Sequence, residues 1–334
     1  MRHHNRQPRE ANGVQVLDNT RALITGAGGF IGSHLTERLL ESGWDVSTVS
    51  RSLSGKPNHV RQVLSETRFH EGDLAALLAA ETLNHDFDYV FHLAGSASVP
   101  DSIAAPAVDL QNNVGLTLAL LENVRHRSHK PKLVYLSSAA VYGNPVNIPI
   151  TEENSVAPIS PYGISKLASE SYMRVYSEIF GVPTVVVRPF SVYGPRQEKL
   201  VIYDLLKQLE AGGTTLNIRG DGTQARDFIH ISDVIDAILA IALKAPFAGE
   251  AYNIGSGSSV TVKDLVSLLL EATGQARKVV YSDKINAGEP LRWQVDIAKL
   301  RALGFSPRVS LKDGLRALGS SFALPQPGEV LCQT

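Results

Sequence analysis

The stretch that decides the fold is Ala22-Leu-Ile-Thr-Gly-Ala-Gly-Gly-Phe-Ile-Gly32, in which a short apolar run leads directly into a glycine-rich loop. A helical pattern of apolar residues follows the loop as far as Gly43. Glycine lets the backbone turn sharply and approach a pyrophosphate closely, and the first turn of a helix offers unpaired N–H groups. The order of strand, loop and helix therefore predicts a dinucleotide site rather than a turn without a ligand. The residues expected to line it here are Gly26, Gly29, Phe30, Ile31 and Gly32.

Strand and helix patterns alternate through the first half of the chain. Further strands are expected at Val46–Val49, Tyr89–Leu93, Lys132–Leu136 and Thr184–Arg188. Helices are expected between them, among them Val114–Arg125 and Ser165–Phe180. Because continuously apolar strands separated by helices form parallel sheets covered on both faces, the predicted class is α/β, a Rossmann-type doubly wound parallel sheet.

The predicted organisation has three parts. They are a flexible polar tail over residues 1–20, a dinucleotide-binding domain over residues 21–188, and mainly a smaller α/β lobe over residues 189–334. Helical patterns in the lobe cover Val201–Leu209 and Val262–Ala272, and segments near residues 225–255 are expected to return to the main sheet.

Composition excludes several classes of protein. The 32 Lys and Arg against 33 Asp and Glu give a net charge of −1, which offers no general attraction to nucleic acid or to an anionic membrane. The single cysteine, Cys332, cannot form an internal disulfide, and no apolar run approaches the roughly 18 residues that span a bilayer. We therefore expect a cytoplasmic protein with no nucleic-acid or membrane partner.

The end of the second predicted strand bears on the choice between NAD and NADP. A carboxylate there would bind the adenosine ribose hydroxyls, but this chain has Ser50 and Arg51. Because a guanidinium group pairs with a 2′-phosphate, these residues favour NADP; the alternative is a solvated Arg51, with Ser50 bonded more weakly to NAD. Asp73, which precedes Leu74 in the expected cofactor site, is predicted either to contact the adenine or to cap the next helix.

A tyrosine and a lysine four residues apart, Tyr162 and Lys166, share one face of a predicted helix. A nearby ammonium group favours the phenolate, so we expect Lys166 to lower the pKa of Tyr162 and make it a base near neutral pH. Ser138 follows the fourth predicted strand, and ligands bind at the carboxyl ends of parallel strands. Its hydroxyl is expected to hold the substrate oxygen that gains or loses the proton.

Several short motifs occur together in this chain. Besides the glycine loop, Tyr162 and Lys166, they are His92-Leu-Ala-Gly95, Asn112-Asn-Val114, Ser137-Ser-Ala-Ala-Val-Tyr-Gly143, Arg188-Pro-Phe-Ser-Val-Tyr-Gly194, Arg226-Asp-Phe-Ile-His230 and Arg292 ahead of Asp296. With these motifs in this order, residues 21–318 resemble the extended short-chain dehydrogenase/reductases of the nucleotide-sugar epimerase/dehydratase group. Within it, the chain is most similar to UDP-glucose 4-epimerase-like members.

The resemblance implies an NAD(P)-dependent nucleotide-sugar 4-epimerase. Such an enzyme transfers hydride from sugar C4 to the nicotinamide, lets the 4-keto sugar rotate, and returns the hydride to the other face. Tyr162 would be the base toward the C4 hydroxyl, Lys166 would bind the nicotinamide ribose, and Ser138 would polarise the same oxygen. The further cofactor-binding residues that the resemblance implies are Leu93, Ala94, Gly95, Asn113 and Pro189.

The resemblance also implies where the nucleotide-sugar substrate binds. The implied residues are Ser138, Ala139, Ser191, Arg226 and Arg292. The last two fall where the group binds the diphosphate, a role that suits guanidinium groups. The alternative is that they form surface ion pairs with Asp227 or Asp296.

Three departures from the group's pattern bear on the activity. Ala139 and Ala140 stand where the 4,6-dehydratases carry acids, and a methyl group cannot do acid–base chemistry, which argues against a dehydratase. Ser191 replaces the usual asparagine of the epimerases, and Arg51 suits NADPH. The first alternative is therefore an NADPH-dependent reductase of 4-keto nucleotide sugars. A non-catalytic NADP(H) sensor is a further alternative, which the intact catalytic residues disfavour.

Two further expectations concern the assembly of the protein and the role of His92. The resemblance implies a homodimer through the helices Val114–Arg125 and Ser165–Phe180, and the apolar residues Ala168, Met173, Val175 and Ile179 permit this. His92 is expected to pack near the cofactor rather than to bind a metal, because no Cys, Asp or Glu has a matching spacing.

Overall fold

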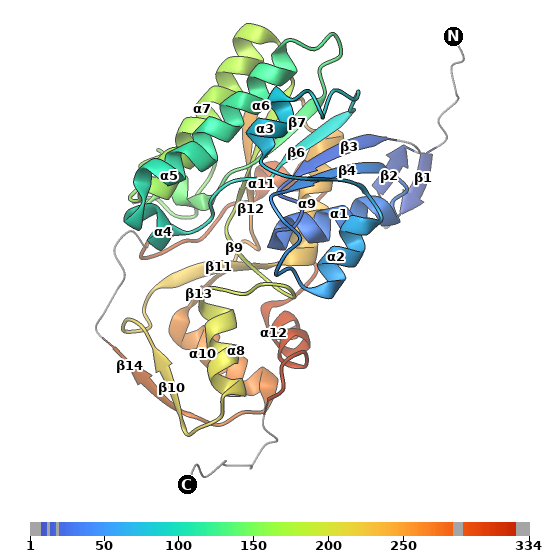
Figure 1. The fold of residues 1–334 in the computed structure, drawn as a ribbon. Coiled ribbons are helices and arrows are strands. Elements are labelled where there is room, and N and C mark those ends of the chain that lie inside the picture. Colours follow the sequence, from blue (N-terminus) through green and yellow to red (C-terminus); the bar gives the residue numbers. More distant parts are fainter. Residues whose placement is uncertain (1–7, 12–13, 18–19, 283–289, 325–334) are drawn as a thin grey trace.

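The computed structural model describes residues 8–11, 14–17, 20–282 and 290–324. Within these residues, a sheet of seven parallel strands forms the centre of the molecule (Figure 1). From one edge to the other, its strands are β12 (Ala248–Ile254), β8 (Thr184–Pro189), β7 (Lys132–Leu136), β6 (Tyr89–His92), β3 (Arg21–Thr25), β4 (Asp45–Ser50) and β5 (Arg68–Glu71). The strand order reverses at β3 and β6, the arrangement in which ligands bind beyond the carboxyl ends of the strands.

The predicted doubly wound α/β class is confirmed, and the five predicted strands lie in this sheet as β3, β4, β6, β7 and β8. Strand β5 lies at an edge and carries polar residues on both sides of Phe69, so the sequence pattern gives only a weak signal for it. The predicted helix Ser165–Phe180 begins earlier, at Pro161. Ser160 caps it, and proline is favoured in the first turn of a helix.

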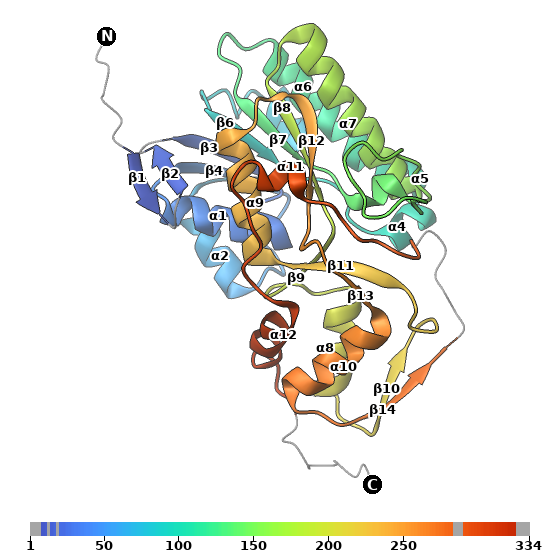
Figure 2. The same cartoon turned by 180° about the vertical axis from the view of Figure 1, so that it is seen from behind.

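Helices cover both faces of the sheet (Figures 1 and 2). One layer contains α1 (Phe30–Glu41), α2 (Asn58–Ser65), α9 (Ile231–Lys244) and α11 (Ala298–Arg301). The other contains α3 (Leu74–Ala79), α4 (Val99–Ala104), α5 (Pro106–Leu110), a π-helical turn η1 (Gln111–Gly115), α6 (Leu116–Arg125) and α7 (Pro161–Phe180). Along β3, Ile24 packs into the first layer and Leu23 into the second, as in a strand buried on both faces.

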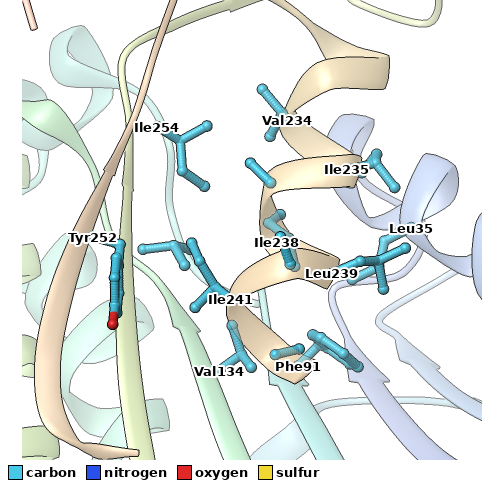
Figure 3. Close-up of a cluster of buried hydrophobic side chains, with 14 of the residues drawn as sticks. Leu35, Phe91, Val134, Val234, Ile235, Ile238, Leu239, Ile241, Tyr252 and Ile254 are labelled. Carbon is cyan, nitrogen blue, oxygen red and sulfur yellow. The ribbon is translucent and has the colours of Figure 1, made fainter. Parts of the chain in front are cut away.

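Helix α9 is apolar around almost its whole circumference and is buried as such helices usually are. In Figure 3, Ile241 lies toward the sheet near Val134, and Leu239 lies beside Leu35 of α1. Burying each such side chain fully contributes about 1.5–3 kcal/mol to folding. Because α9 connects a strand of the smaller lobe to β12 at the edge of the main sheet, this packing ties the lobe to the sheet.

The smaller lobe lies beyond the carboxyl ends of the main strands (Figures 1 and 2). Its strands are β9 (Ser191–Tyr193), β11 (Ala225–His230) and β13 (Ser259–Thr261) in one sheet, and β10 (Thr215–Ile218) and β14 (Lys278–Tyr281) in another. Its helices are α8 (Val201–Glu210), α10 (Val262–Thr273) and α12 (Leu311–Gly319), which share a separate apolar core. The two predicted helices of the lobe are confirmed as α8 and α10.

The segment expected to be a tail contains secondary structure. Strands β1 (Pro8–Ala11) and β2 (Val14–Leu17) form an antiparallel pair in which Ala11 is the partner of Val14. The sequence between them is Asn12-Gly13, the strongest short-range signal for a two-residue hairpin turn. The sequence thus held a signal for this hairpin within residues 1–20.

Candidate active site

The glycine loop lies at the carboxyl end of β3, pressed against the end of β6. Gly26 has a φ of +76°, and a Cβ atom there would lie 2.7 Å from the backbone nitrogen of Ala94. At Gly32 a Cβ would lie 2.3 Å from the carbonyl oxygen of Gly26. Helix α1 then begins at Phe30, and no side chain caps its first N–H groups. A backbone cradle that only glycine can form, at an uncapped helix start, fits the pyrophosphate of a dinucleotide.

A second feature that fits a bound dinucleotide lies at the end of β6. Leu93 and Ala94 are held by Thr25, whose carbonyl and hydroxyl oxygens accept their N–H groups at 3.1 and 3.3 Å. A Cβ on Gly95 would lie 2.4 Å from Oδ1 of Asn113. Among the described residues this Oδ1 is buried without a hydrogen-bond partner. Most buried acceptors in proteins have a hydrogen-bond partner, so this oxygen is available to a donor group of a bound ligand.

The end of β4 carries the groups expected to select the cofactor. A Cβ on Gly28 would lie 2.6 Å from Oγ of Ser50 and 3.3 Å from Cε of Lys56, so both side chains border the glycine loop. Arg51 is exposed beside them. Glu71 is the partner of Ser50 in the strand ladder, and its carboxylate accepts the N–H of Leu53 at 3.3 Å. Lys56 is a basic neighbour that the sequence analysis missed.

The remaining expected cofactor residues lie along the same edge of the sheet. Asp73 accepts the N–H of Ala76 at 3.2 Å, so the helix-capping role predicted for it is confirmed, while the adenine contact stays a prediction. Leu74 is buried in the first turn of α3. Pro189 is buried at the end of β8.

The three predicted catalytic residues come together at the ends of β7 and α7. Lys166 is 4% exposed, and its Nζ donates a 2.9 Å hydrogen bond to the carbonyl oxygen of Leu136. The same Nζ lies 5.9 Å from the centre of the Tyr162 ring. Ser138 caps a short 3-10 helix, η2 (Ala139–Tyr142), by accepting the N–H of Ala140 at 3.2 Å. Its hydroxyl is close enough to the phenol of Tyr162 to favour the ionised form of that phenol and so lower its pKa.

The electrostatics of this cluster correct one expectation. Burial raises the pKa of Tyr162 to about 12, a rise that the nearby hydroxyl of Ser138 opposes. Burial also lowers the pKa of Lys166 to about 8, against the pull of Asp109 and Glu170. The expectation that the pKa of Tyr162 lies below its usual value is therefore wrong for the protein alone, because burial moves it the other way. Loss of water disfavours the charged form of each group, the phenolate of Tyr162 and the ammonium of Lys166.

Two buried carboxylates beside Lys166 were not predicted. Glu170 accepts hydrogen bonds from Arg188 at 2.6 and 3.0 Å and a further one from the hydroxyl of Ser137. Asp109 accepts a 2.6 Å bond from the hydroxyl of Ser165. Glu170 is one helical turn beyond Lys166, so the spacing in the sequence contained a signal for it, whereas Asp109 reaches the site only through tertiary packing.

The expected substrate residues border the smaller lobe. Arg226 extends along β11, with its Cζ 5.5 Å from the centre of the Trp293 ring. The backbone at Arg292 pairs with Ala225, which brings the two arginines onto neighbouring segments. Ser191 begins β9, beside β11, and is half-buried.

Both carboxylates proposed as ion-pair partners of these arginines hold backbone groups. Asp227 accepts the N–H of Ser256 at 2.6 Å, and Asp296 accepts that of Ala298 at 2.6 Å. Ala139 is fully buried in η2, where its methyl group brings no polar atom to the site.

His92 is fully buried beside Thr25, which precedes the glycine loop. Its Nδ1 lies 2.8 Å from Oγ1 of Thr25 and its Nε2 lies 3.2 Å from Oγ1 of Thr117, and burial lowers its pKa to about 3. Across the described ranges, no three His, Cys, Asp or Glu residues are grouped so that they could hold a metal ion. No helix in those ranges is long and apolar enough to cross a membrane. Cys332 lies outside the described residues.

Comparisons with known proteins extend these observations. The sequence model of the NAD dependent epimerase/dehydratase family matches residues 22–255. The chain is 38% identical over 306 residues to the uncharacterized UDP-glucose epimerase YtcB of Bacillus subtilis (strain 168), covering 88% of this chain and 95% of that protein. It is 31% identical over 307 residues to the UDP-glucose 4-epimerase of Mycolicibacterium smegmatis, covering 88% and 96%.

A solved structure agrees with the sequence comparisons. The crystal structure of UDP-glucuronic acid 4-epimerase from Bacillus cereus, in complex with UDP-glucuronic acid and NAD, is 33% identical. It superposes with a TM-score of 0.82 over 90% of this chain and 98% of that chain. The similarity therefore covers the smaller lobe as well as the dinucleotide-binding part.

Proposed function

This chain belongs to the NAD dependent epimerase/dehydratase family, and from that premise we propose that it is a nucleotide-sugar 4-epimerase. The observation that carries the proposal is the cluster of Ser138, Tyr162 and Lys166 beside a glycine cradle. The two relatives and the solved structure described above are named as UDP-sugar epimerases, which supports epimerisation over net reduction of a keto sugar. Ala139 and Ala140 offer no acid or base for a dehydration.

The bound dinucleotide would rest on the glycine cradle, with the unpartnered Oδ1 of Asn113 available at the end of β6. When bound, the oxidised dinucleotide would supply a reversible hydride acceptor for sugar C4 and a positive charge within the site. Tyr162 takes the proton of the C4 hydroxyl through its phenol oxygen and later returns it. Ser138 donates a hydrogen bond to the same sugar oxygen and so keeps it in line with Tyr162.

Lys166 stabilises the deprotonated form of Tyr162 when the site is loaded. In the protein alone, burial keeps the pKa of Tyr162 at about 12. The base therefore forms only when positive charge next to the phenol compensates for the lost hydration. A high pKa without the cofactor protects the site from holding an unpaired phenolate.

The substrate's diphosphate is a suitable partner for Arg226 and Arg292. Their backbones lie on adjacent segments of the smaller lobe. A guanidinium group binds phosphate oxygens through two parallel N–H groups. This leaves the sugar to extend toward Ser138, with Ser191 beside its path.

The cofactor pocket supports NADP over NAD. Arg51 and Lys56 bring two positive charges to the end of β4, where the adenosine ribose is bound in this fold. Glu71 is engaged by the N–H of Leu53. A 2′-phosphate would gain charge-assisted hydrogen bonds from the two cations and from Ser50.

An exposed apolar stripe supports a homodimer. Along α7, Ile164 is 55% exposed and Ile179 is 68% exposed, with Tyr172 between them. On α5, which packs against α7, Val108 and Leu110 are also exposed. Met173 is fully buried and belongs to the core, so its predicted place on the dimer face is wrong. Exposed apolar side chains gathered on two neighbouring helices are typical of an interface. We also propose that the protein is cytoplasmic.

The proposal is tested by incubating the purified protein with UDP-glucose, UDP-galactose, UDP-glucuronic acid and their N-acetylated counterparts. A 4-epimerase converts at least one of these sugars into its C4 epimer, either with its retained dinucleotide or with a catalytic amount added. Stoichiometric consumption of NADPH with a 4-keto nucleotide sugar would instead identify a reductase. Binding of dinucleotide without turnover of any sugar would overturn the proposal.

A further inference from the structure

A buried triangle of polar side chains supports the residue next to Lys166. Asp109 is 3% exposed at the end of α5, and its two carboxylate oxygens accept different donors. The hydroxyl of Ser165 donates to Oδ2 at 2.6 Å, and the amide of Asn113 donates to Oδ1 at 3.1 Å. The same amide also lies 3.1 Å from the hydroxyl of Ser165. Asp109 therefore fixes both the residue that precedes Lys166 and the amide that faces Gly95.

The helix around this triangle departs from regular geometry. Asn113 lies in the π-helical turn η1, which inserts extra backbone between α5 and α6. Such turns occur frequently at functional sites. Here the turn lets Asn113 present its amide to Asp109 on one side and its unpartnered Oδ1 to Gly95 on the other.

The two carboxylates near Lys166 differ in their partners. Glu170 is paired with the guanidinium group of Arg188, whose Nη2 lies 2.6 Å away, so its charge is matched. Asp109 is held by two neutral groups, and no Lys or Arg of the described residues lies within ion-pair distance of it. Burying a carboxylate without a paired cation costs folding free energy. That cost is offset if the carboxylate stabilises a nearby buried cation without direct contact.

Lys166 is that cation. The groups that face it are Asp109 from α5, Glu170 and Tyr162 from α7, Tyr135 from β7, whose ring centre is 5.0 Å from Nζ, and His92 from β6. His92 is held neutral by burial, because its pKa is about 3. Asp109 is thus the carboxylate near Lys166 that has no cation of its own.

We infer that Asp109 is a positioning residue of the active site: it holds Ser165 and Asn113 around Lys166, and its negative charge keeps the Lys166 ammonium group protonated. The catalytic consequence rests on the proposed epimerase function. The effect of Asp109 on the protonation of Lys166 does not depend on that function, because it is a property of the protein without cofactor or substrate.

Removing the charge has a consequence that loss of structure alone does not have. Asp109 raises the pKa of Lys166 and also raises that of Tyr162. Without the carboxylate, both values fall. The acid limb of the pH–rate profile is set by the base Tyr162, and the alkaline limb is set by Lys166. Both limbs therefore move to lower pH. A merely structural defect lowers the height of the profile and leaves its limbs in place.

The test compares Asp109→Asn with Asp109→Glu. Asparagine preserves the triangle, because its oxygen accepts from Asn113 while its amide donates to Ser165, whose own proton turns to the carbonyl of Tyr162, 3.0 Å away. Glutamate keeps the charge and alters the geometry. Asp101→Asn, at an exposed acid on α4, is the matched control for loss of one negative charge.

The first measurement follows the ¹³Cε resonance of Lys166 across pH in cofactor-free protein labelled with ¹³Cε-lysine and assigned with Lys166→Arg. We expect Asp109→Asn to lower the titration midpoint by about one pH unit, as for the loss of a nearby opposite charge. Asp109→Glu and Asp101→Asn should leave it within a few tenths. The second measurement is the pH–rate profile, in which both limbs should move in the same direction in Asp109→Asn alone.

An unchanged Lys166 midpoint in folded Asp109→Asn would overturn the inference, whatever the activity of the enzyme. Failure of Asp109→Asn and Asp109→Ala to fold, while Asp109→Glu folds, would also count against it, because the carboxylate would then serve the fold rather than Lys166. A wild-type protein without epimerase activity, but with a shifted Lys166 midpoint in Asp109→Asn, would defeat the proposed function and leave this inference standing.

Discussion

The ammonium group of Lys166 donates a 2.9 Å hydrogen bond to the carbonyl oxygen of Leu136, the last residue of β7. Ser138 follows two residues later, and Tyr162 precedes Lys166 by one turn of α7. This single bond therefore links the helix that carries the base to the strand that delivers the hydroxyl partner. Catalysis depends on keeping such groups in register, because small displacements at a reacting centre reduce rates strongly.

Tyr162→Phe should abolish the proton transfer and leave the cofactor site intact. The loss of a positioned acid–base group is expected to lower kcat by about 10²–10⁴-fold. Tyr162 is half-buried and lies outside the hydrophobic core, so removing its hydroxyl leaves the core in place. Turnover of a nucleotide sugar and dinucleotide binding by fluorescence are measured on the same preparation. Undiminished kcat in this variant would remove Tyr162 from the reaction.

Gly26→Ala should prevent dinucleotide binding. The new methyl group would lie 2.7 Å from the Ala94 nitrogen, at a backbone φ of +76°. Gly181→Ala is the matched control, because Gly181 also has a positive φ of +60° but has nothing within 4 Å of its Cβ position. Both variants should lose about 1–3 kcal/mol of stability from backbone strain. Only Gly26→Ala should weaken binding in isothermal titration, and equal binding by both would contradict the role of the loop.

Arg51→Asp should reverse the cofactor preference. One charge-assisted hydrogen bond contributes about 1.5–3 kcal/mol, so the ratio of NADP to NAD affinity should fall at least about tenfold. Lys56→Ala should have a smaller effect in the same direction. Arg61→Ala, on the exposed side of α2, is the control for loss of a positive charge. The account of Arg51 would be wrong if the wild-type protein bound NAD and NADP equally.

The stability of the protein should fall in mild acid because of His34 on α1. Its Nε2 donates to the carbonyl oxygen of Pro195 at 2.9 Å, and burial lowers its pKa to about 4. In the unfolded chain its pKa is near 6.5, so the unfolded state binds more protons between these two values. The free energy of unfolding therefore decreases as pH falls from 6.5 toward 4, by at most about 1.4 kcal/mol per pH unit for this group.

His34→Gln keeps a donor for Pro195 and removes the titration. Denaturant unfolding at several pH values between 7 and 4 should give a shallower pH dependence in His34→Gln than in the wild type. If the free energy of unfolding had the same pH dependence in both proteins, His34 would not contribute to the loss of stability in acid.

Ile179→Glu should dissociate the dimer. A charge on this 68% exposed residue of α7 would have to be desolvated at the proposed interface. Light scattering coupled to size exclusion should report a dimer for the wild type and a monomer for the variant. Val280→Glu, at an exposed position on β14 of the smaller lobe, should remain dimeric. A monomeric wild type would contradict the assignment of this face.

The sequence predicts well the features that depend on residues close together in the chain. The glycine loop and the pair Tyr162 and Lys166 are set by short-range geometry, namely strand, turn and helical spacing. Ser138 could be placed because it follows an apolar strand, and parallel strands end at one edge of the sheet.

What the sequence does not predict depends on tertiary packing. Asp109 reaches Ser165 across 56 residues, so no spacing in the sequence reveals their hydrogen bond. The pKa of Tyr162 could not be given the right sign either. It depends mainly on burial, which the sequence does not quantify.

The central claim is that hydride leaves sugar C4 and returns to the same carbon within one site. It is tested most directly with a nucleotide sugar that carries deuterium at C4, incubated with the purified protein and analysed by NMR and mass spectrometry. The account predicts a C4 epimer that retains the deuterium at C4, with none in the bulk solvent or in added free dinucleotide. Loss of the deuterium, or its stoichiometric transfer to free dinucleotide, would contradict it.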